Sequence, residues 1–380
     1  MALRIGLFTE CYRPIQNGIV SSVDALARAV RDRGHEAIII TPHMPHYRDD
    51  DRAQVLRIAS LPLPTPTAYR LTVPYVPAAL GDLSIVHAHS PFVTGVLAAA
   101  HARRGRLPLV FTYHTQLEAY AHYVPFEAHA TRAAATFLTR AFSNAADAVV
   151  VPTAAMERRL RSLGVRSHIS VVPSGIDVAA FAGGHRRTDL RKRFGVDETR
   201  RLVLVVGRLG REKNVEHVLA AFASLGDPQA NLVIIGDGAH RATLERHAVR
   251  LGIAARTTFA REFARATLPD AYASADVLAF ASRSETQGLV LAEALAAGTP
   301  IVALDTPQTR DVLAGAGTLV ASEDPAAFAA ALRSTLAGER SCGKGSAWRF
   351  DGAALGDRVM ELYEALLEQP APLTSNICSR

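Results

Sequence analysis

The stretch 281–300 holds the residue types and the spacing best suited to chemistry. It follows the apolar run 277–280, which predicts a buried parallel strand, and it continues as a helical pattern. The first amides of a helix have no intrahelical partner and lie at the positive end of its dipole, so they attract anions. We therefore expect Gly288, Leu289 and Val290 to form a seat for phosphate oxygens.

Two carboxylates flank this seat, Glu285 before it and Glu293 after it. They are separated by about two helical turns, so they cannot act on one atom as a paired acid and base. We expect one to meet a group beyond the phosphates and the other a group alongside the helix, as a sugar nucleotide requires. The alternative is that Glu285 is a charge at a helix N-terminus and Glu293 a solvated side chain.

A second candidate is the loop 206–214, which follows the strand predicted at 202–206. Arg208 can hold phosphate oxygens in a bidentate fork and Lys213 can act as a point charge, so the two cations suit a departing diphosphate. A solvated basic loop is the alternative.

Weaker signals follow three other predicted strands. Gly18 stands at a helix entrance, where backbone amides can approach a phosphate, but Asn17-Gly18 is also common turn chemistry. Gly236 belongs to a Gly-Asp-Gly turn. His114 follows the strand 109–112 and can hydrogen-bond a sugar hydroxyl, although a lone histidine is more often structural. No G-x-G-x-x-G fingerprint is present, so a nicotinamide dinucleotide has little support.

Two apparent metal motifs are set aside. Residues 49–51 contain Asp-x-Asp, yet they lie in a proline-containing loop and not at a strand end, so a solvated charge run is expected. His87 and His89 alternate at a strand end without a carboxylate or cysteine at metal spacing, so we expect no metal.

Strands and helices alternate in two series. The first has strands at 4–9, 37–41, 55–58, 84–87, 109–112 and 148–151 and a helix at 21–33. The second has strands at 202–206, 232–235, 257–259, 277–280, 301–304 and 318–320 and helices near 215–224 and 242–251. We predict an α/β protein with two doubly wound domains, 1–178 and 185–350, facing a cleft, and a final helix within 351–370.

Composition fits this organisation. The 380 residues are 49% hydrophobic and 21% charged, as in a soluble globular protein. Three widely spaced cysteines indicate neither a disulfide framework nor a metal cluster and fit a reducing cytoplasm. We see no signal peptide, no apolar run near the about 20 residues of a spanning helix, and no nucleic-acid module. Residues 1–180 hold 18 Lys plus Arg against 13 Asp plus Glu, which suits an anionic partner or solubility alone.

The motifs together resemble the family 4 retaining glycosyltransferases. The match rests on Glu285 and Glu293 with seven residues between them, on Gly298-Thr299-Pro300, and on Gly207-Arg208 with Lys213. The resemblance implies the GT-B fold, with two Rossmann-like domains and a C-terminal helix that crosses back to the first. It also implies a nucleotide-sugar donor, most often UDP-glucose or another UDP-hexose, and no metal or other cofactor.

The resemblance also assigns roles to residues. Arg208, Lys213 and the amides of 288–290 would stabilise the departing diphosphate, with Gly18 and Gly236 beside the donor. Glu293 would hold the ribose, and Glu285 and His114 the donor sugar. The segment 258–263, with Arg261, matches the part that holds the nucleotide base, but Ala260 replaces the family's common glycine and leaves that contact open.

Two features are similar to the bacterial glycolipid-forming branch, including diacylglycerol glucosyltransferases: the sequence Glu285-Thr286-Gln287-Gly288 and the run 113–123. They imply a lipid hydroxyl as acceptor, with acceptor-side residues Glu118, Tyr120, His122 and Tyr123. They also imply peripheral attachment to the inner face of the cell membrane, helped by apolar residues at 71–76 or 137–142. The alternatives are a soluble acceptor (a nucleoside, an inositol or an aminocyclitol), a binding protein without transfer activity, and an epimerase.

Overall fold

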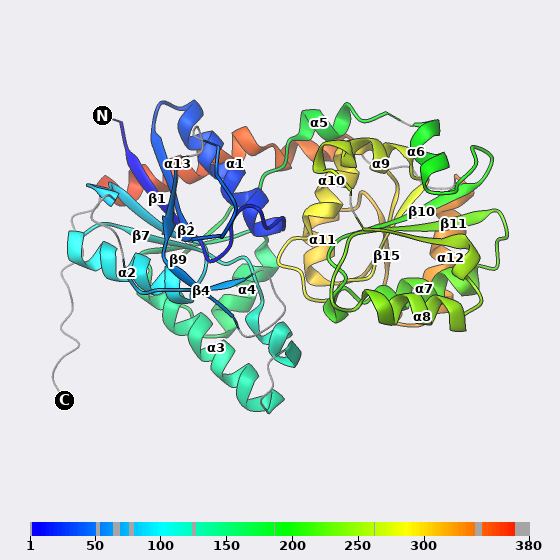
Figure 1. The fold of residues 1–380 in the computed structure, drawn as a ribbon, viewed down its shortest axis with the longest axis horizontal. Helices are drawn as coiled ribbons and strands as arrows, with labels where there is room; N and C mark the ends of the chain where they lie inside the picture. The colour runs from blue at the N-terminus through cyan, green and yellow to red at the C-terminus, as the bar shows by residue number, and fades with distance from the viewer. Residues whose placement is uncertain are drawn as a thin grey trace. The chain divides into compact units, whose positions relative to one another are not determined.

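The computed structural model describes residues 2–50, 54–63, 69–75, 80–123, 127–185, 187–261, 263–338 and 344–368. Within these ranges the chain forms two compact units, each a parallel sheet covered by helices (Figure 1). Unit 1 comprises the residues up to 152 together with 156–175 and 352–368, and unit 2 comprises 153–155 and 176–351. The expected pair of Rossmann-like domains is confirmed.

Unit 1 is built on seven parallel strands in the order β3-β2-β1-β6-β7-β8-β9. Their bounds are β1 Arg4–Phe8, β2 Glu36–Pro42, β3 Val55–Ile58, β6 Ile85–Ala88, β7 Leu109–Thr112, β8 Ala148–Val151 and β9 His168–Val171. The central strands β1, β6, β7 and β8 are buried almost throughout, because helices cover both faces of the sheet. The sequence analysis missed β9 and the separate hairpin of β4 Ser60–Pro62 and β5 Arg70–Thr72, which are short.

The helices of unit 1 are α1 Gly18–Asp32, α2 Val93–Gly105, α3 Ala128–Ala145, α4 Ala154–Ser162 and α13 Gly352–Glu368, with the 3-10 helix η3 Leu117–Tyr123. The last helix, α13, packs on α1 of the same unit, as expected. Their contact is close: a Cβ built on Gly356 would lie 2.3 Å from the Cβ of Ala29. Glycine at this position therefore lets the returning helix approach α1.

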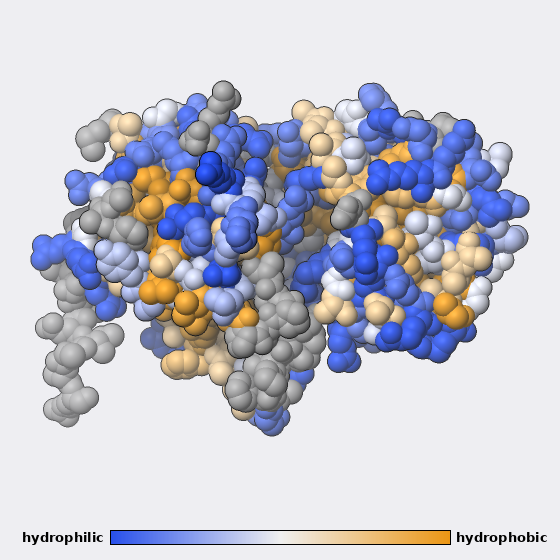
Figure 2. All heavy atoms as spheres, viewed as in Figure 1, coloured by the Kyte–Doolittle hydropathy of each residue, from blue (hydrophilic) through white to orange (hydrophobic). Residues whose placement is uncertain are grey.

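Unit 2 has six parallel strands in the order β12-β11-β10-β13-β14-β15. The strands are β10 Arg201–Val206, β11 Ala230–Ile235, β12 Thr257–Ala260, β13 Val277–Phe280, β14 Ile301–Leu304 and β15 Thr318–Val320. The helices are α5 Val178–Ala182, α6 Thr188–Arg193, α7 Val215–Leu225, α8 Arg241–Arg250, α9 Leu268–Ser274, α10 Leu289–Ala297, α11 Pro307–Leu313 and α12 Pro325–Leu336. Figure 2 shows hydrophilic residues over the outer surface of α8.

The strand order determines which loops can meet. In unit 2 the order reverses between the neighbouring strands β10 and β13, and ligands in such sheets bind beyond the carboxyl ends of the strands at this point. The loops after these two strands carry Lys213 and Glu285, which are far apart in sequence. In unit 1 the neighbours β6 and β7 likewise bring His89 and His114 together.

Candidate active site

Three hydrogen bonds join the loop after β10 to the loop after β13. Lys213 Nζ donates to Glu285 Oε1 at 2.5 Å, and Asn214 Nδ2 donates to the carbonyl of Ala281 at 3.3 Å. Ser282 Oγ donates to the carbonyl of Glu212, also at 3.3 Å. The two candidate stretches identified from sequence therefore form one site.

Glu285 lies against the N-terminus of α10. Gly288, the residue before this helix, has a φ of 81°, and a Cβ built on it would lie 3.6 Å from Glu285 Cγ. A left-handed φ strains any residue except glycine, so Gly288 is required for this entry into the helix. No described side chain caps α10, and Glu285 of the Lys213–Glu285 pair lies beside the start of this helix.

Arg208 pairs with a carboxylate that the sequence analysis did not assign. Its Nη2 donates to Glu212 Oε1 one turn later, and the side chain of Glu212 is 2% exposed whereas that of Arg208 is 46% exposed. The interpretation of 206–214 as a merely solvated basic loop is therefore wrong. Both cations of the site are balanced by carboxylates of the same unit.

Glu293 is buried, at 3% exposure, so the alternative of a solvated helix side chain is wrong. Its Oε2 accepts a hydrogen bond of 2.7 Å from the hydroxyl of Tyr272, and its Oε1 lies 3.6 Å from Arg265 Nη2. Burial raises the pKa of Glu293, while the positive charge of Arg265 and the hydrogen bond from Tyr272 oppose that rise. The carboxyl is therefore held in place on α10 by side chains from α9 and from the 3-10 helix η6 Arg265–Thr267.

Glycines allow close approach of the backbone after β10 and β11. Gly207 and Gly236 have φ of 144° and 143°, and a Cβ on Gly236 would lie 2.0 Å from the carbonyl oxygen of Gly207. Arg261, which follows β12, is 65% exposed with its Nε 3.6 Å from Asp237 Oδ2. Gly236 and Arg261 thus lie at the carboxyl ends of neighbouring strands, on the same edge as Lys213.

Gly18 is the first residue of α1 in unit 1. The side chain of Asn17 caps this helix by accepting a hydrogen bond of 2.9 Å from the amide of Val20. Asn17-Gly18 therefore forms the cap and first residue of a helix, and one amide at this helix entrance already has a partner.

His114 lies just beyond β7, where its Nε2 is 2.8 Å from Nδ1 of His89. Removal of the ring from bulk water lowers the pKa of His114 to about 4, so the imidazole is neutral at neutral pH. Glu118, an expected acceptor residue, forms an ion pair with Arg159 of α4, with its Oε1 2.7 Å from Arg159 Nε. The side chains of His122 and Tyr123 lie outside the described residues.

Two family models match consecutive parts of the chain, Glycosyltransferase Family 4 over residues 16–180 and Glycosyl transferases group 1 over residues 186–346. A GDP-mannose-dependent alpha-mannosyltransferase of Mycobacterium tuberculosis is 32% identical over 322 residues, which cover 82% of this chain and 81% of the relative. The chain belongs to the family 4 glycosyltransferases.

Other members of this glycosyltransferase family are similar over comparable lengths. An alpha-monoglucosyldiacylglycerol synthase of Streptococcus pneumoniae is 30% identical over 322 residues, covering 82% of this chain and 73% of the relative. Among solved structures, Anabaena HepE in complex with UDP and glucose matches with a TM-score of 0.76 at 18% identity, over 96% of this chain and all of that one. The GT-B fold is thereby confirmed.

The structure describes part of the two motifs that resembled metal sites in the sequence. Asp49 pairs with Arg57, with Oδ1 to Nη2 at 2.7 Å and Oδ2 to Nε at 2.9 Å, and its side chain is 17% exposed. The expectation of a solvated charge is wrong for Asp49, because the returning strand β3 brings Arg57 to it; Asp51 lies outside the described residues. In the described part of the chain, no His, Cys, Asp and Glu side chains group as a metal site.

Sequence reasoning also missed Tyr272, Arg265 and Glu212, which hold the expected site residues in place. Glu212 lies between Arg208 and Lys213 in the loop 206–214, so a carboxylate four residues after Arg208 could have been predicted to pair with it. Tyr272 lies in a short apolar helix and resembles a core residue, and nothing in the sequence links it to Glu293. Only the packing of α9 against α10 makes that contact.

Replacing Glu293 by glutamine is expected to change how stability depends on pH. Burial raises the pKa of the Glu293 carboxyl in the folded protein above its ordinary value of 4.5 in the unfolded chain. The folded state therefore binds the carboxyl proton more tightly, and the contribution of Glu293 to wild-type stability falls as pH rises above 4.5 toward the raised pKa. Glu293→Gln does not lose stability in this way, because the glutamine amide does not ionise. Its free energy of unfolding relative to wild type should increase from about pH 5 to about pH 7, by at most about 1.4 kcal/mol per pH unit.

Urea unfolding followed by the fluorescence of Trp348 measures this difference, because this single tryptophan lies in unit 2. Glu245→Gln, which alters an exposed carboxylate of α8, is the matched control. Parallel pH profiles for the wild type and Glu293→Gln would show that burial of Glu293 does not perturb its ionisation.

Proposed function

We propose that this glycosyltransferase moves a hexose, glucose, from a UDP-sugar to the hydroxyl of a membrane lipid such as diacylglycerol, with retention of the anomeric configuration. The observation that carries the proposal is the Lys213–Glu285 pair beside Gly288 and the uncapped start of α10. A cation, a carboxylate and a helix N-terminus without a side-chain cap lie next to one another there. A sugar nucleotide requires such a set, with the cation and the helix N-terminus for its diphosphate and the carboxylate for its sugar.

In this proposal Lys213, Arg208 and the amides of Gly288, Leu289 and Val290 neutralise the diphosphate as its bond to the sugar breaks. Charge that develops on a leaving group is the largest target for electrostatic stabilisation. Lys213 and Arg208 then exchange part of their contact with Glu285 and Glu212 for contact with phosphate oxygens. Glu285 is released toward the sugar hydroxyls.

The remaining donor contacts follow the same edge of the sheet. Glu293 accepts hydrogen bonds from the ribose hydroxyls, and Gly236 and Arg261 lie on the nucleotide side. Gly18 approaches the diphosphate and His114 contacts the donor sugar. We propose that the departing diphosphate itself accepts the proton of the acceptor hydroxyl on the front face of the sugar, since a nucleophile on the opposite face is not evident. The cations of the chain take the place of a metal.

A donor and acceptor screen tests this function. Release of UDP or GDP is followed for UDP-glucose, other UDP-hexoses and GDP-mannose, each with diacylglycerol vesicles, an inositol, a nucleoside and an aminocyclitol. We expect turnover with UDP-glucose and diacylglycerol, an α-linked product from the α-linked donor, and the same rate in EDTA. Faster turnover with GDP-mannose would overturn the donor, and loss of activity in EDTA that Mg²⁺ restores would overturn the metal-free mechanism.

Absence of transfer with every pair, despite tight UDP binding, would favour a binding protein or an epimerase. Conversion of UDP-glucose into another UDP-hexose separates those two. Transfer to a soluble acceptor would use the same donor site, so comparison of the acceptors in this screen decides between a lipid and a soluble acceptor.

Lys213→Ala and Arg208→Ala should each lower kcat by about 100-fold or more, because one lost donor to a developing charge costs about 3–4 kcal/mol. Arg246→Ala, on the exposed surface of α8, is the matched control and should leave kcat unchanged. Circular dichroism checks that the folds are intact. Near wild-type kcat in both site variants would remove the assignment to the diphosphate.

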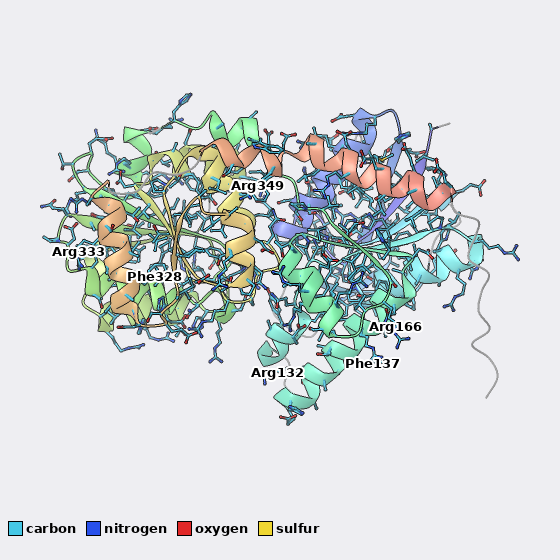
Figure 3. All side chains as sticks on the ribbon, turned by 180° about the vertical axis from the view of Figure 1, so that it is seen from behind. Arg132, Phe137, Arg166, Phe328, Arg333 and Arg349 are labelled. Carbon is cyan, nitrogen blue, oxygen red and sulfur yellow. The ribbon has the colours of Figure 1, made fainter. Side chains whose placement is uncertain are left out.

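The lipid acceptor is supported by a cationic, partly apolar surface on α3 of unit 1. This helix contains no Asp or Glu, and Phe137 on it is 72% exposed. Arg132 and Arg140 are exposed on the same helix, and Arg166 lies beside its end, where its amide bonds Asn144 Oδ1 at 2.7 Å (Figure 3). Such a surface can meet anionic phospholipids through both charge and apolar contact.

The two apolar stretches expected from sequence divide differently in the structure. Phe142 belongs to the core of unit 1, so of the two phenylalanines at 137–142 only Phe137 is exposed. In the hairpin of β4 and β5, Leu61 and Leu71 are 57% and 46% exposed. Val76 lies outside the described residues. Across those residues, no helix has the length and apolarity to cross a membrane.

Phe137→Ser combined with Arg132→Ser and Arg140→Ser should weaken flotation with vesicles that contain anionic lipid. The loss is about 1.5–3 kcal/mol for the phenyl ring and about 1 kcal/mol for each charge, or more than 100-fold in partition. Val249→Ser, at a 66% exposed apolar residue of α8, is the matched control. Equal flotation of all three proteins would rule out this membrane surface. No membrane association together with efficient glucosylation of a water-soluble alcohol would rule out the lipid acceptor.

A further inference from the structure

Three histidine rings are stacked in the interior of unit 1. His87 is the penultimate residue of β6, and His89 directly follows that strand. His114 follows the neighbouring strand β7. The ring centroids of His87 and His89 are 4.3 Å apart with planes 24° from parallel, and those of His89 and His114 are 5.1 Å apart at 22°. His87 and His89 are buried. The ring of His114 thus rests on a fixed column.

All three rings are neutral at neutral pH. Burial lowers the pKa of His87 to about 3 and that of His89 well below its ordinary range, and a charge on His114 would lower the pKa of both further. A neutral imidazole has one nitrogen that donates and one that accepts. The 2.8 Å contact between His89 Nδ1 and His114 Nε2 therefore carries a single proton, so the tautomers of the two rings are linked.

We infer that His89 is a positioning residue that fixes the orientation and the tautomer of His114. This inference rests on the proposed function, in which His114 contacts the donor sugar. Because Nε2 of His114 is engaged by His89, Nδ1 is the nitrogen through which His114 would contact the sugar. Whether Nδ1 donates to a hydroxyl or accepts from it is decided by where His89 leaves the shared proton.

The other two members of the column differ in what they bond. His87 is fully occupied, with the Tyr363 hydroxyl 2.6 Å from its Nδ1 and the Thr112 hydroxyl 2.7 Å from its Nε2. His89 Nε2, in contrast, is buried without a hydrogen-bond partner among the described residues. A purely structural position would be better served by an apolar side chain than by a half-satisfied imidazole. The nitrogen that is satisfied is the one that meets His114.

The unsatisfied nitrogen has a polar environment within reach. His89 lines a cavity of about 40 Å³ together with Ser22 of α1, Ser174, and Gly352 and Gly356 of α13. A cavity of this size has room for a water molecule, which donates or accepts as needed. The cavity therefore accommodates either tautomer of His89, and the pairing with His114 is the contact that selects one.

The test compares His89→Asn with His89→Gln. The asparagine amide lies near the place of Nδ1 and can still bond His114, whereas the glutamine amide lies near the place of Nε2 and cannot. We expect kcat to fall less than threefold in His89→Asn and more than tenfold in His89→Gln, with the Kd for UDP unchanged in both, because UDP lacks the donor hexose that His114 contacts. Tyr363→Phe, which removes a hydrogen bond from the far end of the same column, is the control and should lower Tm with kcat within twofold of wild type.

A second readout is independent of turnover. Ring ¹⁵N shifts report the tautomer of each histidine; we expect the same tautomer for His89 and His114 in the wild type, both Nδ1–H or both Nε2–H, and a changed tautomer distribution for His114 in His89→Gln. An unchanged His114 tautomer in that variant, or equal kcat for Asn and Gln variants, would overturn the positioning role. A wild type that transfers sugar from no donor would overturn the proposed function instead, and the ¹⁵N shifts would still decide the link between the two rings.

Discussion

The ion pair between Lys213 and Glu285 is the contact on which the candidate site of unit 2 depends. It joins the loops after β10 and β13, and both side chains are about four-fifths buried, at 22% and 17% exposure. Partly buried charges are costly unless paired, so loss of either partner would leave the other uncompensated. Because Glu285 also lies against Gly288, the pair ties the cations of one loop to the helix end of the other.

A second carboxylate with a different environment complements this pair. Glu293 is buried between the Tyr272 hydroxyl and the Arg265 guanidinium, and burial raises its pKa, whereas Glu285 accepts a hydrogen bond from Lys213. One glutamate thus precedes α10 and the other lies within this helix, and the two have different surroundings. The two carboxylates therefore differ in their surroundings, because Glu293 is shared by a phenol and a guanidinium in the interior and Glu285 is held by a lysine.

Unit 1 supplies groups of a different character. Its histidine column is neutral and stacked, and its polar contacts involve His87, Thr112 and Tyr363 in place of ion pairs. The C-terminal helix contributes Tyr363 to this column and Gly352 and Gly356 to the cavity beside it. The return of α13 to unit 1 therefore does more than cover α1, since it completes the surroundings of the strand ends that carry His89 and His114.

The sequence by itself determined most strands and helices of the two series, the glycines at strand ends, and the cations and carboxylates of the candidate site, because periodicity and turn chemistry are local properties. It did not determine that Arg208 pairs with Glu212, that Tyr272 meets Glu293, that Asp49 is bound by Arg57, or that Phe142 is core while Phe137 is exposed. Nor did it link His89 to His114. Only the tertiary structure decided these, because strand order and helix packing bring distant residues together and burial then makes each polar group depend on its partner.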